Sequence, residues 1–237
     1  MGRLIRWLLA PIIILALLFV GANLVVEHLA ESKIASALQS TFHLSSRPAV
    51  RISGFPIILN ILDGKIPRVS FDASGATFEG LAVQQIKVAL VDVTAEGGFL
   101  SGSSIRFTVG AGTVRGRATD AAVNAYLKAH GQNATMAFHE GRVVVRAVRS
   151  FLGRTRTLVA TGTVAREGTL LVFRPASVTV DGHAAPRGSE ALAKQKTTIK
   201  VRLPKLPGGI ESYGVKAVEG AVAIAAVLRD QLLDLSA

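Results

Sequence analysis

The residues of this chain that could do chemistry are few and scattered. No two histidines stand four positions apart, the spacing that places two metal ligands on one helical face. No Gly-x-Ser-x-Gly motif occurs, and no close pair of carboxylates could split its pKa values. The absence of cysteine excludes disulfides and thiolate metal sites. We therefore expect no enzyme activity, no catalytic residues, no metal and no cofactor. The histidines are His28, His43, His130, His139 and His183.

A glycine-rich segment is the other feature that suggests a ligand. Gly110, Gly112 and Gly116 miss the spacing of a dinucleotide-binding loop, and no Lys-Ser or Lys-Thr pair follows, as a phosphate loop requires. We interpret these glycines as turn or bulge positions of a β structure.

An apolar cluster between two turn signals is a candidate lipid site. It begins after Gly54-Phe55-Pro56 and ends before Asp63-Gly64. Each CH₂ group of a lipid tail gains about 0.8 kcal/mol on burial against such a surface. The segment is predicted to be a groove lip or a membrane-dipping loop, and the alternative is a short helix or bent strand packed in the core. The predicted lipid-binding residues are Phe55, Ile57, Ile58, Leu59, Ile61, Leu62, Phe71, Phe78 and Leu81.

Three basic residues accompany this cluster. Arg51 precedes it, and Lys65 and Arg68 follow it. Lysine and arginine hold phosphate through charge-assisted hydrogen bonds. We predict that these three side chains contact a lipid headgroup.

An uncharged run of 20 residues, Trp7–Val26, lies near the N-terminus. It matches the roughly 20 helical residues that cross a bilayer core, so we predict a single span in the inner membrane. Arg3 and Arg6 precede the run, which predicts a cytoplasmic N-terminus and a body in the periplasm or cell envelope. The alternative is a cleaved signal peptide, because Val20-Gly21-Ala22 offers small residues at plausible cleavage positions, and the body would then be secreted.

Positive charge is concentrated in the second half of the chain. The net charge is +11, and Gly141–Lys205 contains 13 Lys and Arg against three acidic residues, a local charge of +10. This indicates an anionic partner such as lipid headgroups, an envelope polymer or an envelope protein, or else simply a soluble strand face. Nucleic acid is not expected as a partner, because few aromatic residues accompany the charge and the body is predicted to be exported.

Hydrophobic spacing predicts one long helix and a β-rich body. Apolar residues recur at helical spacing over Asn23–Phe42, so the span should continue as an amphipathic helix that covers the body. Further helices are predicted over Thr119–His130, capped by Thr119 or Asp120, and near Arg229–Leu235. Period-two alternation predicts strands around Val50–Ile52, Val69–Phe71, Ile86–Leu90, Ile105–Val109, Val143–Val145 and Ile199–Leu203.

The predicted fold class is α+β. An N-terminal transmembrane helix should continue into a long amphipathic helix packed on an elongated, twisted antiparallel β-sheet with a groove. Residues 1–26 would be the membrane anchor or signal peptide, and residues 27–237 an exported lipid-binding domain. The prolines and glycines of Pro204–Gly209 predict a tight loop.

The order of several short motifs resembles a known family. A helix is followed by Pro48-x-Val50-x-Ile52-x-Gly54-Phe55-Pro56, then by Gly64-x-Ile66-x-x-Val69-x-Phe71 and Gly80-Leu81-x-Val83. Leu203-Pro204-x-Leu206-Pro207-Gly208-Gly209 and Gly220-x-Val222 follow near the C-terminus. This pattern resembles the LmeA-like phospholipid-binding proteins of actinobacterial cell envelopes.

The resemblance implies a membrane-anchored or exported protein that binds phospholipid or glycolipid. It also implies a role in envelope glycolipid assembly, such as lipomannan biosynthesis, without catalytic residues. The implied body is an elongated, twisted sheet around a long helix, similar to tubular lipid-binding domains. The resemblance assigns no headgroup-binding residues.

Overall fold

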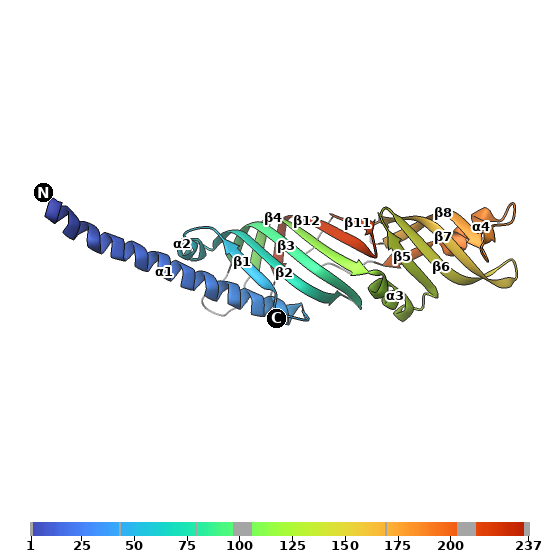
Figure 1. Cartoon of the computed structure of the whole chain (residues 1–237), viewed down its shortest axis with the longest axis horizontal. Coiled ribbons are helices and arrows are strands. Elements are labelled where there is room, and N and C mark those ends of the chain that lie inside the picture. Colours follow the sequence, from blue (N-terminus) through green and yellow to red (C-terminus); the bar gives the residue numbers. More distant parts are fainter. Residues whose placement is uncertain are drawn as a thin grey trace.

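The N-terminal segment forms one continuous helix, α1 (Gly2–Thr41). The structure is a computed structural model that describes residues 2–42, 44–78, 80–96, 106–168, 170–202 and 212–234. The helix is long and apolar enough to cross a membrane, which fits an anchor and a signal sequence alike. Its C-terminal part lies beside the β-rich body, and its N-terminal part projects away from it (Figure 1). The predicted continuation of the apolar run into the body is therefore confirmed.

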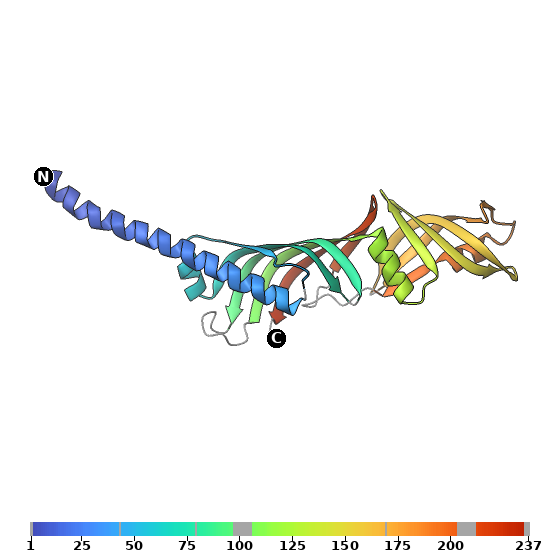
Figure 2. The same cartoon turned by 60° about the horizontal axis from the view of Figure 1, so that its bottom comes forward.

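Within the described ranges, the strands form two antiparallel sheets of six strands each. The sheets follow one another along the long axis of the molecule (Figures 1 and 2). This confirms the α+β class, with the strands divided between two sheets. The first sheet has the order β1 (Ala49–Ser53), β2 (Lys65–Phe78), β3 (Leu81–Glu96), β4 (Arg106–Thr119), β12 (Ala221–Asp234) and β11 (Ser212–Val218).

The second sheet is inserted in sequence between β4 and β11. Its order is β10 (Ile199–Arg202), β8 (Leu170–Val180), β7 (Arg154–Glu167), β6 (Arg142–Phe151) and β5 (Ala134–His139), and β9 (His183–Ala184) pairs with β8. Three short helices complete the described fold: α2 (Ile57–Leu62), α3 (Asp120–Ala129) and α4 (Glu190–Thr197). Helix α4 packs on β6, β7 and β8, and α3 lies where the two sheets meet (Figure 2).

The first sheet has one aliphatic face, called here the inner face. Cross-strand neighbours on this face run from Val69 through Leu90 and Gly112 to Leu228. Alternation along each strand places apolar side chains together on one side of the pleat. Buried members of the face are Val50, Ile52, Val69, Ala73, Val83, Ile86, Val88, Leu90, Ala118, Ala226 and Leu228.

The glycines of β4 lie inside the strand. The alternative that they form a turn is wrong, whereas the bulge alternative holds near Gly116, because the β3–β4 register shifts between the pairs Gln84–Arg117 and Lys87–Arg115. A Cβ atom at Gly112 would come within 2.7 Å of Leu90 Cδ2, and one at Gly116 within 2.7 Å of Val83 Cγ1. Glycine therefore lets the longer side chains of β3 close over β4, a packing role that the spacing of the glycines did not indicate.

Helix α1 lies against the free edge of β1. The Glu31 carboxylate accepts a hydrogen bond of 2.9 Å from the backbone N–H of Ile52. Arg47, just before the strand, donates to the Ser32 carbonyl oxygen at 2.7 Å and to Ser36 Oγ at 3.1 Å. An edge strand exposes unpaired backbone groups. Glu31 therefore satisfies one backbone group of this edge, and Arg47 ties the turn before β1 to α1.

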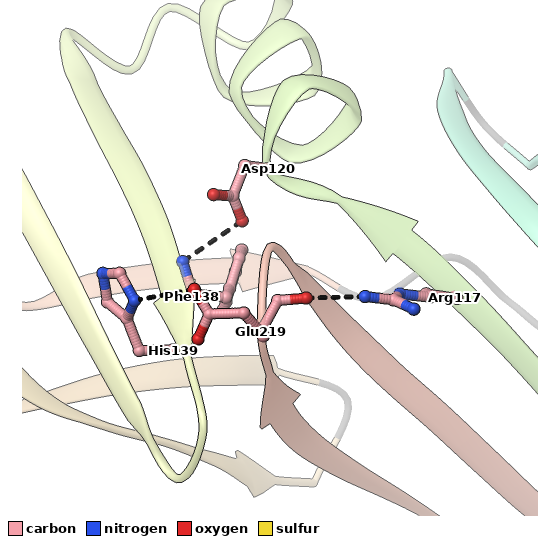
Figure 3. A network of polar contacts seen from close by, with 5 residues as sticks. All are labelled: Arg117, Asp120, Phe138, His139 and Glu219. Atoms are coloured by element: carbon pink, nitrogen blue, oxygen red, sulfur yellow. Dashed lines mark hydrogen bonds and ion pairs between the residues drawn. The ribbon is translucent and has the colours of Figure 1, made fainter.

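Backbone and side-chain hydrogen bonds join the two sheets (Figure 3). The Gly220 N–H, in the β11–β12 turn, donates to the Phe138 carbonyl oxygen of β5 at 2.9 Å. The Phe138 N–H in turn donates to Asp120 Oδ1 of α3 at 3.1 Å. Arg117 donates to the Glu219 carbonyl oxygen at 2.6 Å, and the Glu219 carboxylate lies 3.2 Å from His139 Nδ1. The first and second sheets are therefore fastened at one joint.

Helix α3 confirms the predicted central helix. The Thr119 hydroxyl accepts a hydrogen bond of 3.3 Å from the Ala122 N–H, as expected of an N-cap. Gly131 follows the helix with a left-handed φ of 69°. The buried residues of the helix are Val123, Tyr126 and Leu127, which form one face.

The helix predicted near Arg229–Leu235 is wrong. Strand β12 continues to Asp234 and pairs with β4 as far as Arg106. The local residues are good helix formers, but without β12 the first residues of β4, which pair with β3 on one side, would leave their other edge unpaired. The predicted loop over Pro204–Gly209 lies outside the described residues.

Candidate lipid-binding site

An open hollow of about 330 Å³ lies between α1 and the connection from β1 to α2. We call it the α1 hollow. This volume falls at the lower end of the roughly 300–1,000 Å³ of small-molecule sites, so it suits part of a lipid. One wall is a single helical face, because its residues recur at spacings of three and four. The lining consists of Val20, Asn23, Leu24 and Glu27 of α1, with Ile52, Ser53, Gly54, Phe55 and Ile57 opposite.

Two asparagines fix the connection that forms the second wall. Asn23 is buried, and its Oδ1 accepts a hydrogen bond of 3.3 Å from the Ile58 N–H in the first turn of α2. Asn60 donates to the Gly54 carbonyl oxygen at 3.0 Å. Pro56, the N-cap residue of α2, makes no side-chain cap of its own. The first turn of α2 is therefore capped from α1.

Gly54 is required by close approach. It has a φ of 140°, a conformation that side chains disfavour. A Cβ atom there would lie 2.9 Å from the Pro67 ring and 3.0 Å from Asn60 Nδ2. The turn into α2 therefore packs directly on β2.

Helix α2 presents apolar side chains to solvent. Phe55 is 68% exposed, Leu59 50% and Leu62 67%. The Phe55 ring meets the ring of Phe19 of α1 edge to face, with centroids 6.3 Å apart. Ile57 points inward and is buried, whereas Ile58 and Ile61 are partly buried. The cluster is thus a short helix with one face on the body and one apolar face open.

The α1 hollow is continuous with the inner face through Ile52. This residue lines the hollow and pairs with Val69 of β2. Phe71, two residues further along β2, is partly buried against the same core. Ile52 therefore joins the wall of the hollow to the buried aliphatic residues of the inner face.

The three predicted headgroup residues lie near this surface but on its outer side. Arg51 and Arg68 are exposed and alternate with Ile52 and Val69, which face inward. Arg68 pairs with Ser53, a residue of the hollow, and Arg51 lies two positions before Ser53 on β1. Lys65 is exposed and follows α2 after a two-residue turn. Positive charge therefore surrounds the α2 end of the body.

Phe78 and Leu81 lie far from the other predicted site residues. They form the β2–β3 hairpin end, next to α3, whereas α2 precedes the opposite end of β2. A strand of 14 residues such as β2 spans roughly 43 Å at about 3.3 Å per residue. One site cannot contain both ends, so the nine predicted residues divide into an α2 group, the central Phe71, and a distant pair.

Most of the chain matches the model of one protein family. The model of the LmeA-like phospholipid-binding family matches residues 21–227. The chain belongs to the LmeA-like phospholipid-binding family. No curated protein and no solved structure matches the chain.

The region matched to the LmeA-like family begins inside α1. Residue 21 is two positions before Asn23, so most of the α1 wall of the hollow lies within the match. Sequence reasoning did not select Asn23, Leu24 or Glu27 as site residues. The available signal was Asn23 itself, a polar residue inside an apolar helical run, where a polar side chain needs a specific partner.

The basic second half of this LmeA-like chain is partly neutralised. Three of its cations pair with the three acidic residues of Gly141–Lys205, in the pairs Arg156–Asp181, Arg174–Glu167 and Lys194–Glu190. Lys205 lies outside the described residues. Exposed cations outside these pairs are Arg142, Arg146, Arg154, Arg166, Arg187, Lys196 and Lys200. They are spread over β6, β7, α4, β10 and the β9–α4 loop, so they do not form one compact cluster.

No metal centre accompanies the site in the part of the chain that the structure describes. There, no three His, Cys, Asp or Glu side chains come close enough together to hold an ion. The polar groups of the α1 hollow are Asn23, Ser53 and Glu27. Such a lining can bind apolar groups and orient a polar one.

Proposed function

We propose that this protein binds phospholipid without transforming it, with acyl chains held in the α1 hollow and along the inner face of the first sheet. The observation that carries the proposal is the hollow itself, an aliphatic site beside an apolar helix in a chain of a phospholipid-binding family. Arg51, Lys65 and Arg68 would hold the phosphate at its rim. The finer assignment is a role in envelope glycolipid assembly, such as lipomannan biosynthesis, with lipid transfer as one form of it.

The proposed topology follows the charge around α1. Arg3 and Arg6 stay in the cytoplasm, and the body lies in the periplasm or cell envelope. We favour retention of α1 as an anchor, because the same helix supplies one wall of the hollow. Cleavage after Ala22 would remove Val20 from that wall.

A filling substitution tests the site without disturbing the core. Ser53 lines the hollow and is exposed, so Ser53→Trp would occupy the space that a lipid needs. Native mass spectrometry of the full chain, released gently from bacterial membranes, is expected to show bound phospholipid. The Ser53→Trp protein should lose it, and Thr77→Trp, at an exposed position near the far end of β2, should keep it. Repeated absence of lipid from the unaltered protein would refute the function.

A second function is supported by the exposed cations of the second sheet. These side chains could bind an anionic envelope polymer or an acidic partner protein by electrostatic attraction, as a structural or scaffolding module would. Salt separates the two functions, since polymer binding through exposed charges should weaken steeply with ionic strength, whereas acyl-chain capture should barely respond. Lipid retained at high salt by the unaltered protein therefore favours the first function.

A further inference from the structure

We propose that the α2 end of the body is immersed in the bilayer leaflet on the body side, so that the α1 hollow opens among the lipids. Phospholipid would then enter sideways from that leaflet without crossing water. The entry route rests on the proposed phospholipid binding, whereas the depth of α2 does not.

The length of α1 sets this depth. If the span is Trp7–Val26, Phe19 lies seven residues inside its end, or about 10 Å at 1.5 Å per residue. Phe55 contacts Phe19 edge to face, so it shares this depth. Ile58, capped by Asn23, lies about 5 Å inside the end by the same count. Helices that lie in a membrane interface are buried by about 5–10 Å, which matches α2.

A body held in water would require a shorter span. The span would have to end before Phe19, which leaves the uncharged residues Trp7–Leu18. Twelve helical residues measure about 18 Å, well short of the roughly 30 Å hydrocarbon core. Extending the span in the other direction would draw Arg6 and Arg3 into the core. The contacts between α1 and α2 therefore place α2 at the membrane.

The surface of α2 fits an apolar neighbour. Phe55, Leu59 and Leu62 expose half or more of their area. Helix α2 lies at the end of the body from which α1 projects (Figure 1). Neighbouring α1 residues are exposed and apolar as well, among them Leu18 at 65% and Leu24 at 60%. A contiguous apolar surface of this kind marks a contact with membrane or protein. Because this apolar surface is continuous with the predicted span, we infer that it contacts the membrane and not another protein.

Basic residues lie one step behind this apolar end. Lys65 follows α2 after a two-residue turn, and Arg68 pairs with Ser53 on the strand that leads to Phe55. When α2 reaches the acyl chains, side chains a few residues back reach the phosphates. Anionic headgroups attract basic side chains that lie close to the membrane surface. Apolar side chains therefore lie at the depth of the acyl chains, and basic side chains lie at the depth of the phosphates.

The same depth places the hollow within the leaflet. Val20 and Leu24 line it at the level of the acyl chains, and Glu27 lines it at the end of the span. A lipid tail could move from the bilayer into the hollow beside Phe55. The polar end of the lipid would stay near Glu27 and the flanking cations.

Depth-dependent quenching of a fluorescent label tests this proposal. Because the chain has no cysteine, single substitutions can be labelled cleanly with an environment-sensitive dye. The full chain is reconstituted in vesicles of phosphatidylcholine and phosphatidylglycerol that contain lipids with a quencher on the acyl chain. A label at Leu59→Cys is expected to lose fluorescence to the quencher and to shift its emission to the blue, as a label at Leu18→Cys does.

The chain offers a matched control. Leu152, at the β6–β7 hairpin, is 61% exposed against 50% for Leu59, and it lies at the opposite end of the molecule. A label at Leu152→Cys should show neither quenching nor the shift. A Leu59 label that behaves like the Leu152 label overturns the proposal, and so does an unquenched Leu18 label. Intact mass of protein recovered from its own membranes must show a chain that includes Phe19, because a shorter chain overturns it equally.

A cross-linking experiment separates the route from the function. A phospholipid with a photoreactive tail, present in the vesicles, should cross-link to peptides that contain Leu24 or Ile57, and Ser53→Trp should abolish this. Quenching at Leu59 without bound lipid in native mass spectrometry would refute phospholipid binding and leave the depth of α2 standing. Bound lipid without quenching at Leu59 would refute the route and leave the function standing.

Discussion

Two polar residues inside apolar segments decide where the apolar cluster lies. Asn23 interrupts the apolar run of α1 and caps α2, and Asn60 interrupts the α2 cluster and holds the Gly54 carbonyl oxygen. Each satisfies a backbone group that would otherwise be left unpaired next to lipid or core. Helix α2 is therefore positioned by hydrogen bonds with these two polar residues.

Removing the Asn23 cap should loosen α2. In Asn23→Leu the Ile58 N–H loses its acceptor, and loss of a cap costs about 1 kcal/mol. Hydrogen exchange of α2 amides, followed by mass spectrometry, should become about fivefold faster. Ser40→Ala, which removes an exposed bond within α1, is the control and should leave α2 exchange unchanged.

Asp181 should make part of the stability dependent on pH. The hydrogen bond from Arg156 at 2.6 Å, and then that from the Thr157 N–H, lower the pKa of this carboxyl below its usual 3.8. Its contribution to stability is present above that value and is lost as pH falls through the lowered folded-state pKa. The difference in Tm between the unaltered protein and Asp181→Asn should therefore shrink below pH 3.8. A constant difference across this range would contradict the assignment.

Local spacing identified most elements but could not identify their partners. Period-two alternation predicted β1, β2, β3, β4, β6 and β10, because half-buried strands show it directly. It gave no sign that β12 returns to β4 across the whole inserted second sheet. An unpaired strand edge exposes backbone N–H and C=O groups, which favours pairing even between distant segments. The same effect explains why the segment predicted as a C-terminal helix is a strand. Sequence reasoning selected the α2 cluster as a candidate site, whereas the α1 wall of the hollow required knowledge of which helix lies beside it.

A buried glycine at the β7–β8 irregularity should be essential to the second sheet. The register between these strands shifts at Thr161 and Gly162, where Gly162 faces Pro175. A Cβ atom at Gly162 would collide with the Arg174 carbonyl oxygen and lie 2.8 Å from Pro175 Cα, and these are backbone atoms. Gly162→Ala should cost about 1–3 kcal/mol or more in the free energy of unfolding.

Thermal unfolding measures this effect, at about 2–4 °C of Tm per kcal/mol for a chain of this size. Gly214→Ala is the matched control in the first sheet, because its Cβ atom would meet nothing closer than the Ala225 carbonyl oxygen at 3.9 Å. Equal Tm values for the two variants would show that the sheet accommodates the added methyl group.

As a whole, the molecule is a long body with its predicted anchor at one end. The second sheet lies beyond the first, and α4 and the β6–β7 hairpin are farthest from the start of α1 (Figure 1). The joint of Figure 3 decides whether this length is stiff, because it links the β11–β12 turn, α3 and β5. A stiff body would hold the exposed cations of the second sheet at a fixed distance from the membrane.

Asp120→Ala should loosen this joint. The buried Phe138 N–H would lose its carboxylate acceptor, which costs about 1–3 kcal/mol. Spin labels at Asp72→Cys and Ser150→Cys, one on each sheet, should show a broader distance distribution than in the parent protein. Glu190→Gln is the control, because its contact with Lys194 lies within α4, away from the joint, and it should leave the distribution narrow.

The contact of Glu31 with the β1 edge would be lost if proteolysis released the body from the membrane. A protease that cut the chain beyond Glu31 would release the body and strip the edge strand in the same event. The bared Ile52 N–H and its neighbours would then be a template for strand addition from another copy. Liberated bodies should therefore associate edge to edge, whereas intact molecules remain separate.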